Sequence, residues 1–162
     1  MLKARRGLLA TLTAGVAAIA FPSRKTAAGQ TMDPVGGHGL VGPWTVTSMN
    51  PSGRQTKILL TFTADGSVFR TSDTHPVQGV GHGSWALIND REFDAMYVAM
   101  RFDEARQLVG TQKTRIRIMS EPGSDEFTGM TKVSMLDVDG NEQSAVQTML
   151  VGSRLKLEAF DA

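Results

Sequence analysis

The sequence predicts an all-β domain, an eight-stranded antiparallel up-and-down β-barrel. Beyond residue 40 no segment has the apolar spacing of a helix of useful length. Instead, about eight apolar or alternating segments follow one another, separated by short turns rich in Gly, Pro, Asn or Asp. Strands joined in this way pair with their neighbours, and closing the meander into a barrel removes its two exposed edges. The alternative is a cone-shaped sheet wrapped on a helix, which the missing helix disfavours.

The N-terminal segment, residues 1–28, is typical of a signal peptide. Three cations in the first six residues precede an apolar run at 7–21, which is too short for a comfortable transmembrane helix. Small residues at the spacing of a cleavage site favour a cut near Ala28, with Ala20 as the alternative. The arginine pair at positions 5 and 6 leaves both twin-arginine export and the general secretory route open. We expect an exported protein, periplasmic or secreted, without a stable membrane anchor.

Composition excludes several classes of function. The segment 1–28 carries five of the 17 Lys and Arg residues and none of the 16 Asp and Glu, so its removal changes the formal net charge from +1 to −4. A mildly acidic domain lacks the basic surface that binds nucleic acid. The chain has no cysteine, which excludes disulfides, thiolate zinc sites and a lipid-anchored cysteine. The domain must therefore be stabilised by its core, and about 120 residues are enough for that.

The expected elements follow in order after a flexible, glycine-rich leader at 29–39, with the barrel over 40–160. Tight turns at Asn50 to Gly53, Ala64 to Gly66 and Asp139-Gly140 mark three of the hairpins. The expected strands are 40–49, 57–63, 67–72, 83–88, 92–102, 108–120, 125–136 and 142–157.

The clearest alternation lies in the strand expected at 108–120. Lys113, Arg115 and Arg117 alternate there with Gln112, Thr114, Ile116 and Ile118. Because successive side chains of a strand point to opposite faces, the first set is expected to face solvent and the second the barrel interior.

Two Gly-x-Trp motifs, Gly42-Pro43-Trp44 and Gly83-Ser84-Trp85, hold the only tryptophans of the chain. The first resembles the G-x-W signature of the lipocalins and the wider calycin group, and Arg154 is placed like the arginine that packs across that tryptophan at the closed barrel end. Residues 38–160 are also similar to small exported bacterial proteins of lipocalin-like type. The shared motifs are Phe62 to Gly66, Gly83 to Trp85, Phe102-Asp103, Phe127-x-Gly129 and Asp139-Gly140.

The resemblance implies a barrel fold with a lumen, and it transfers no particular ligand. The chain lacks the Thr-Asp-Tyr motif, the disulfide and the C-terminal helix of classical lipocalins. A tryptophan-sealed barrel is also similar to avidin-type barrels, whose additional ligand-binding tryptophans are missing here.

The stretch 73–83 is the least regular part of the predicted barrel and holds two of the three histidines. If the protein is an enzyme, His82, His75, Asp73 and Tyr97 are the candidates for acid–base catalysis. The alternative is that the histidines are exposed turn residues, and the absence of a nucleophile at recognisable spacing favours it. Asp73 and the two histidines offer at most three metal ligands without a typical spacing, so neither a metal nor another cofactor is expected.

Candidate ligand-binding residues are Trp85, Met96, Tyr97, Gln112 and Thr114. Tyr97 shares one face of its strand with Phe93, Ala95 and Ala99, but the opposite face, with Met96, Val98 and Met100, is apolar as well. The pattern leaves open which face points inward and whether the strand methionines line an adaptable pocket or fill the core.

Two functions are consistent with these observations. The first is a non-enzymatic carrier that binds a small apolar molecule in the barrel lumen outside the cytoplasm. The second is a cofactor-independent isomerase, cyclase or lyase that acts on such a molecule by acid–base catalysis. The lack of a nucleophile or metal-spaced cluster favours the carrier. A barrel with a filled interior is a third possibility, and the sequence does not indicate an oligomeric state.

Overall fold

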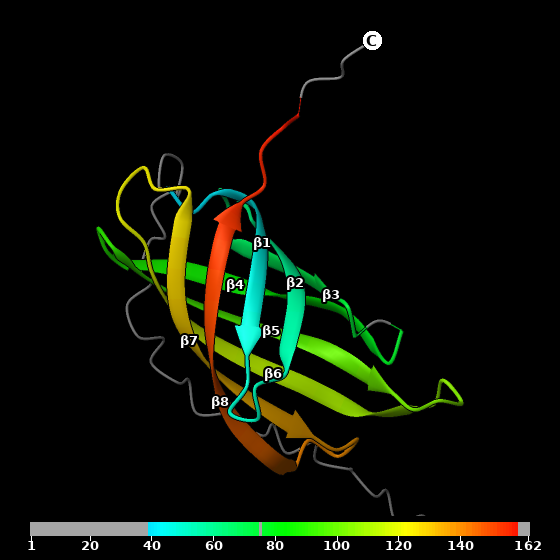
Figure 1. Ribbon diagram of the computed structural model, residues 1–162. Coiled ribbons are helices and arrows are strands. Elements are labelled where there is room, and N and C mark those ends of the chain that lie inside the picture. Colours follow the sequence, from blue (N-terminus) through cyan, green and yellow to red (C-terminus); the bar gives the residue numbers. More distant parts are fainter. Residues whose placement is uncertain (1–38, 75, 159–162) are drawn as a thin grey trace, which may run out of the picture. The chain divides into compact units, whose positions relative to one another are not determined.

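The computed structural model describes residues 39–74 and 76–158, and these form a closed barrel of eight antiparallel strands in sequence order (Figure 1). This confirms the predicted fold. Within these two ranges, no helix is long and apolar enough to cross a membrane. The predicted signal peptide at 1–28, nearly all of the leader at 29–39, and His75 lie outside the described residues. The strands are β1 (Gly42–Met49), β2 (Gln55–Phe62), β3 (Ser67–Ser72), β4 (Gln78–Asn89), β5 (Glu92–Phe102), β6 (Leu108–Met119), β7 (Glu126–Leu136) and β8 (Glu142–Arg154).

The barrel closes where β8 pairs with β1, and Figure 1 shows the two strands, orange-red and cyan, side by side. The register aligns Trp44 with Arg154 and Met49 with Met149. Each strand therefore has a hydrogen-bonded partner on both sides, and the sheet has no free edge.

Side-chain alternation sets which residues line the interior. In β5, the buried residues are Phe93, Ala95, Tyr97 and Ala99. The residues that alternate with them at Met96, Val98 and Met100 are exposed. The irregularity in the pairing of β5 with β6 lies at Arg101/Phe102, beyond this stretch. The sequence left open which face of β5 points inward. The structure shows that it is the face with Phe93, Ala95, Tyr97 and Ala99.

The alternation predicted for β6 is confirmed. Gln112, Thr114, Ile116 and Ile118 are buried, Arg115 and Arg117 are exposed, and Lys113 on the same outer face is half-buried.

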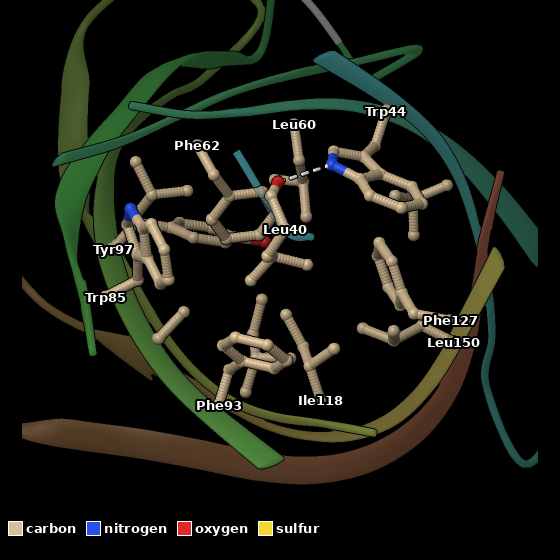
Figure 2. Packing of buried hydrophobic residues seen from close by; sticks show 14 of the residues in the cluster. Leu40, Trp44, Leu60, Phe62, Trp85, Phe93, Tyr97, Ile118, Phe127 and Leu150 are labelled. Carbon is tan, nitrogen blue, oxygen red and sulfur yellow. Dashed lines mark hydrogen bonds between the residues drawn. The ribbon is translucent and has the colours of Figure 1, made fainter. Parts of the chain in front are cut away.

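One end of the barrel is closed by aromatic packing. Figure 2 shows Trp44, Phe62, Trp85, Phe93 and Phe127 arranged around Leu40. The indole Nε1 of Trp44 donates a hydrogen bond to the Leu40 carbonyl oxygen at 2.8 Å, and the Trp44 and Phe127 ring centroids are 4.8 Å apart. Large flat side chains thus fill this end and satisfy their polar atoms on the backbone.

Arg154 caps the same end, as predicted. Its guanidinium carbon lies 4.2 Å from the centroid of the Trp44 ring. The guanidinium also donates to the carbonyl oxygens of Val41, at 2.8 Å, and Gly39. The interaction of cation and ring, together with these hydrogen bonds, ties the segment before β1 to the end of β8.

The strand β4 begins at Gln78, so the prediction that it starts near Gly83 was wrong. Only residues 73–77 connect β3 to β4. The start of β4 was predicted too late because the first half of this strand is rich in glycine. Glycine has a low strand propensity, and a glycine-rich segment is typical of a loop. The strands β2 and β8 also differ from the predicted ranges, because β2 begins at Gln55 and β8 ends at Arg154.

Candidate functional site

The barrel encloses a cavity of about 220 Å³ on the side away from the aromatic closed end. Leu60 and Leu150 lie at its inner part, and Asn50 and the exposed Arg54, from the β1–β2 turn, lie at its rim. The cavity therefore opens to solvent at the end where the turns β1–β2, β3–β4, β5–β6 and β7–β8 meet. Its apolar lining residues are Val46, Ile58, Leu60, Ile116, Val133, Met135, Val146 and Leu150.

A chain of polar side chains lines the cavity and comes from the β3–β4 connection, β4 and β6. Thr74 Oγ1 donates to Gln78 Oε1 at 2.8 Å, Gln78 Nε2 donates to Gln112 Oε1, and Gln112 Nε2 donates to Thr114 Oγ1 at 3.1 Å. Each amide is thereby held by a neighbour, which fixes its orientation in a low-dielectric interior. A second group of hydroxyls lies on β1, β7 and β8, where Thr148 Oγ1 is 2.7 Å from Thr131 Oγ1 and 2.9 Å from Ser48 Oγ.

Arg70 of β3 also lines this cavity and is only 3 % exposed. Its Nη2 donates to Ser72 Oγ, whereas its Nε and Nη1 have no hydrogen-bond partner in the described part of the chain. Burial lowers the pKa of Arg70, and the nearby Tyr97 and Asp73 oppose that shift. Because arginine starts from a very high pKa, the side chain stays positively charged at neutral pH.

Tyr97 of β5 lines the cavity beside Arg70 and is 2 % exposed. Burial raises the pKa of the Tyr97 phenol, and the charge of Arg70 partly opposes this. At neutral pH the phenol is therefore uncharged and can donate a hydrogen bond.

Two glycines of β4 make room for Arg70 and Tyr97. A Cβ at Gly81 would lie 3.0 Å from Tyr97 Cδ2 and 3.3 Å from Arg70 Cβ. A Cβ at Gly83 would lie 2.6 Å from Tyr97 Cα and would overlap the Met96 carbonyl oxygen. The glycines that hid the start of β4 in the sequence thus allow its close approach to β5.

Three of the predicted ligand-binding residues meet in the cavity, namely Tyr97, Gln112 and Thr114. The other two do not line it. Trp85 belongs to the closed end, where its Nε1 donates to the Thr63 carbonyl oxygen at 3.0 Å and its ring packs against Phe62. Met96 is 38 % exposed and lies on the outer face of β5, because it alternates with the inward Tyr97.

The three acid–base candidates that the structure describes, Asp73, His82 and Tyr97, are not brought together by the fold. His82 is exposed on the outer face of β4, where its ring packs edge-to-face on Phe69 with centroids 5.3 Å apart. The Asp73 carboxylate accepts a hydrogen bond from the backbone N–H of Lys57 at 3.1 Å on the exposed β3–β4 connection. Of Asp73, His82 and Tyr97, only Tyr97 lines the cavity.

The remaining strand side chains add no further reactive cluster. Met135 is the one described methionine in the cavity wall, whereas Met100, Met119, Met130 and Met149 are exposed on the outside. In the part of the chain that the structure describes, no group of three or more His, Asp or Glu side chains could hold a metal ion.

Arg70 is the buried charged residue of the cavity, and the sequence interpretation missed it. A signal for it exists in the β2–β3 hairpin, where the register pairs Phe62 with Val68 and Leu60 with Arg70. Because Phe62 and Leu60 are inward apolar residues, their partners on β3 share that inward face. The expectation that an arginine faces solvent concealed this.

Comparison with known proteins supports the fold. The chain matches no protein-family model, and no curated protein is significantly similar to it. A solved structure described as "EF1p2_mFAP2b bound to DFHBI" is similar, with a TM-score of 0.54 and 17 % sequence identity over 72 % of this chain and 94 % of that chain. At this identity the likeness concerns the barrel architecture alone.

Proposed function

We propose that this protein is an exported, lipocalin-like barrel that binds one small molecule with an apolar body in its cavity. The observation that carries the proposal is the cavity itself, which combines apolar walls, a few fixed polar groups and an open rim. Its volume of about 220 Å³ lies below the roughly 300 Å³ at which most ligand pockets begin, so the occupant is small. Export rests on the signal-peptide pattern of residues 1–28.

Binding without catalysis is the better supported of the two functions. Tyr97 is the described acid–base candidate on the cavity wall, and its raised pKa makes it a poor base at neutral pH. The similar solved barrel is bound to the small molecule DFHBI, which supports the view that a barrel of this architecture accommodates such an occupant.

The proposal can be tested with octan-1-ol as a neutral apolar probe. We expect saturable binding of one molecule per chain, measured by isothermal titration calorimetry. Val133→Phe places a larger side chain in the cavity wall and should weaken binding at least about tenfold, because it removes the space for the probe. Val151→Phe is the matched control, since Val151 is exposed on the outer face of β8. An absence of saturable binding, or equal affinity in the two variants, would contradict a cavity site.

A further inference from the structure

The cavity contains a buried cation, Arg70, that has no ion-pair partner among the described residues, although Asp73 and Tyr97 lie near it. The unpartnered Nε and Nη1 of Arg70 carry three of the five N–H donors of the guanidinium. Within residues 39–74 and 76–158, no carboxylate forms an ion pair with Arg70. The nearby Asp73 is exposed and accepts the Lys57 backbone N–H instead. A buried cation with unused donors is costly unless an anion approaches it.

We propose that the cavity selects small monocarboxylates and that Arg70 binds their carboxylate group. This assignment rests on the proposed ligand-binding function and specifies the chemistry of the ligand. The planar guanidinium matches the planar carboxylate, and hydrogen bonds between two charged groups are stronger than neutral ones. The uncharged phenol of Tyr97 lines the cavity beside Arg70 and Thr114, where its hydroxyl can turn to donate a further hydrogen bond to the same group.

The rest of the cavity defines the other end of the ligand. Val46, Ile58 and Leu150 lie in the wall formed by β1, β2 and β8, and these side chains suit a short apolar body. Arg70 is the one arginine or lysine among the buried residues of the described chain. The other lining arginine, Arg54, is exposed at the rim, so Arg70 alone provides positive charge in the buried part of the cavity. This single charge balances a monoanion there, whereas a phosphate dianion would leave a second buried charge unpaired. The arrangement therefore favours a carboxylate with an apolar tail.

Three probes that share an eight-carbon chain separate this inference from the proposed function. We expect octanoate to bind the full-length protein at least about tenfold more tightly than octan-1-ol, and octylammonium to bind most weakly, because a charge-assisted hydrogen bond favours the anion. Isothermal titration calorimetry at neutral pH measures all three affinities.

Substitution of Arg70 should abolish the preference without abolishing binding. In Arg70→Met the affinity for octanoate should fall to that for octan-1-ol, while octan-1-ol binding changes less than about twofold. Arg115→Met is the matched control, because it removes the same charge from the exposed outer face of β6 and should leave the preference intact. Circular dichroism establishes that each variant is folded.

The ionisation of Tyr97 gives a readout that does not depend on a variant. Tyr97 is the only tyrosine of the chain, so the absorbance of tyrosinate reports on this residue alone. Saturating octanoate should raise the pKa of the Tyr97 phenol further, because the bound carboxylate disfavours a negative charge on the neighbouring phenolate. The uncharged octan-1-ol should not raise this pKa. This measurement and the wild-type preference decide the question even if Arg70→Met does not fold.

The outcomes are distinguishable. If octan-1-ol binds as tightly as octanoate, or octylammonium binds most tightly, the carboxylate assignment is wrong and the cavity function stands. If none of the three probes binds, both proposals are wrong. If Arg115→Met removes the preference as fully as Arg70→Met, the selectivity comes from overall charge, and the assignment to Arg70 is wrong.

Discussion

Tyr97 has an environment that can be measured directly, because no other tyrosine absorbs in this chain. Burial raises the pKa of its phenol above the ordinary value of 10.0, so the folded state disfavours the ionised form. The stability associated with the neutral phenol is fully present below pH 10 and is lost as the pH rises through the folded-state pKa.

We expect the midpoint of tyrosinate absorbance in the ligand-free protein to lie above pH 10, with a fall in the free energy of unfolding, measured by circular dichroism, as the pH rises through that midpoint. Tyr97→Phe should show no tyrosinate absorbance and a smaller loss of stability over the same range. A midpoint at or below that of free tyrosine would contradict the buried placement.

At this scale the sequence revealed part of the cavity. Alternation in β6 correctly placed Gln112 and Thr114 inside, since their neighbours Arg115 and Arg117 need solvent. The same reasoning hid Arg70, because composition assigns an arginine to the outside and only the hairpin register shows that it shares a face with Leu60. Long-range pairing, which a single sequence does not specify, was the missing information.

Among the elements, the junction of β1 and β8 is stabilised by one side chain above all. Arg154 contacts the Trp44 ring, two backbone carbonyls and Asp125, whereas Lys156 pairs with Asp125 alone. The side chain of Arg154 is 23 % exposed and that of Lys156 68 %. Salt bridges of exposed side chains contribute little to stability, so the two residues should differ sharply.

Arg154→Ala should lower the free energy of unfolding by about 2–4 kcal/mol, because it uncovers Trp44 and leaves the carbonyls of Gly39 and Val41 without a donor. Lys156→Ala should lower it by about 0.5 kcal/mol or less. Urea denaturation followed by circular dichroism measures both. Equal losses would show that the pair with Asp125, common to both residues, is the main contribution.

The element boundaries show what sequence patterns can and cannot predict. Turn residues correctly marked the β2–β3 hairpin, because Gly66 adopts a positive φ of 85° that suits glycine. The start of β4 was missed because its glycines are selected by the close approach of β5, a tertiary contact without a local signature. Including His82 in the irregular stretch 73–83 followed from that error, because the residue lies within β4.

At the scale of the whole barrel, the two ends differ in character, because aromatic side chains fill one end and the other end is hollow. Ile118 and Ile116 lie on the same inward face of β6, one near each end, so substitutions there compare the packing of the two ends. Ile118 is packed in the closed-end core, whereas Ile116 borders the cavity. A side chain beside an existing cavity already lacks contacts on one side, so its removal costs less.

Ile118→Ala should destabilise the protein by about 3–4 kcal/mol, and Ile116→Ala by at least about 1 kcal/mol less. Chemical denaturation monitored by circular dichroism gives both values. Ile116→Ala should also enlarge the cavity and accept a probe one or two carbons longer. Equal destabilisation by the two substitutions would indicate that the barrel is packed evenly along its axis.

At this scale the fold was predictable, whereas the sequence left open whether the interior is hollow or filled. Short turns between consecutive strands leave closure as the way to remove both edges, and the β1–β8 pairing follows. Alternation shows which side chains point into the barrel, but it does not show whether these side chains fill the interior or leave a cavity between them. Trp85 was therefore expected in the lumen, although its size and its bond to Thr63 place it in the closed end.

The positions of Trp44 and Trp85 have a practical consequence. Both lie in the closed-end core, and neither lines the cavity. The intrinsic fluorescence of this protein therefore follows the melting of the closed end and is insensitive to what occupies the other end. A denaturation curve followed by tryptophan fluorescence therefore reports unfolding separately from ligand binding in the cavity. A fluorescence assay of ligand binding needs a ligand that is itself fluorescent.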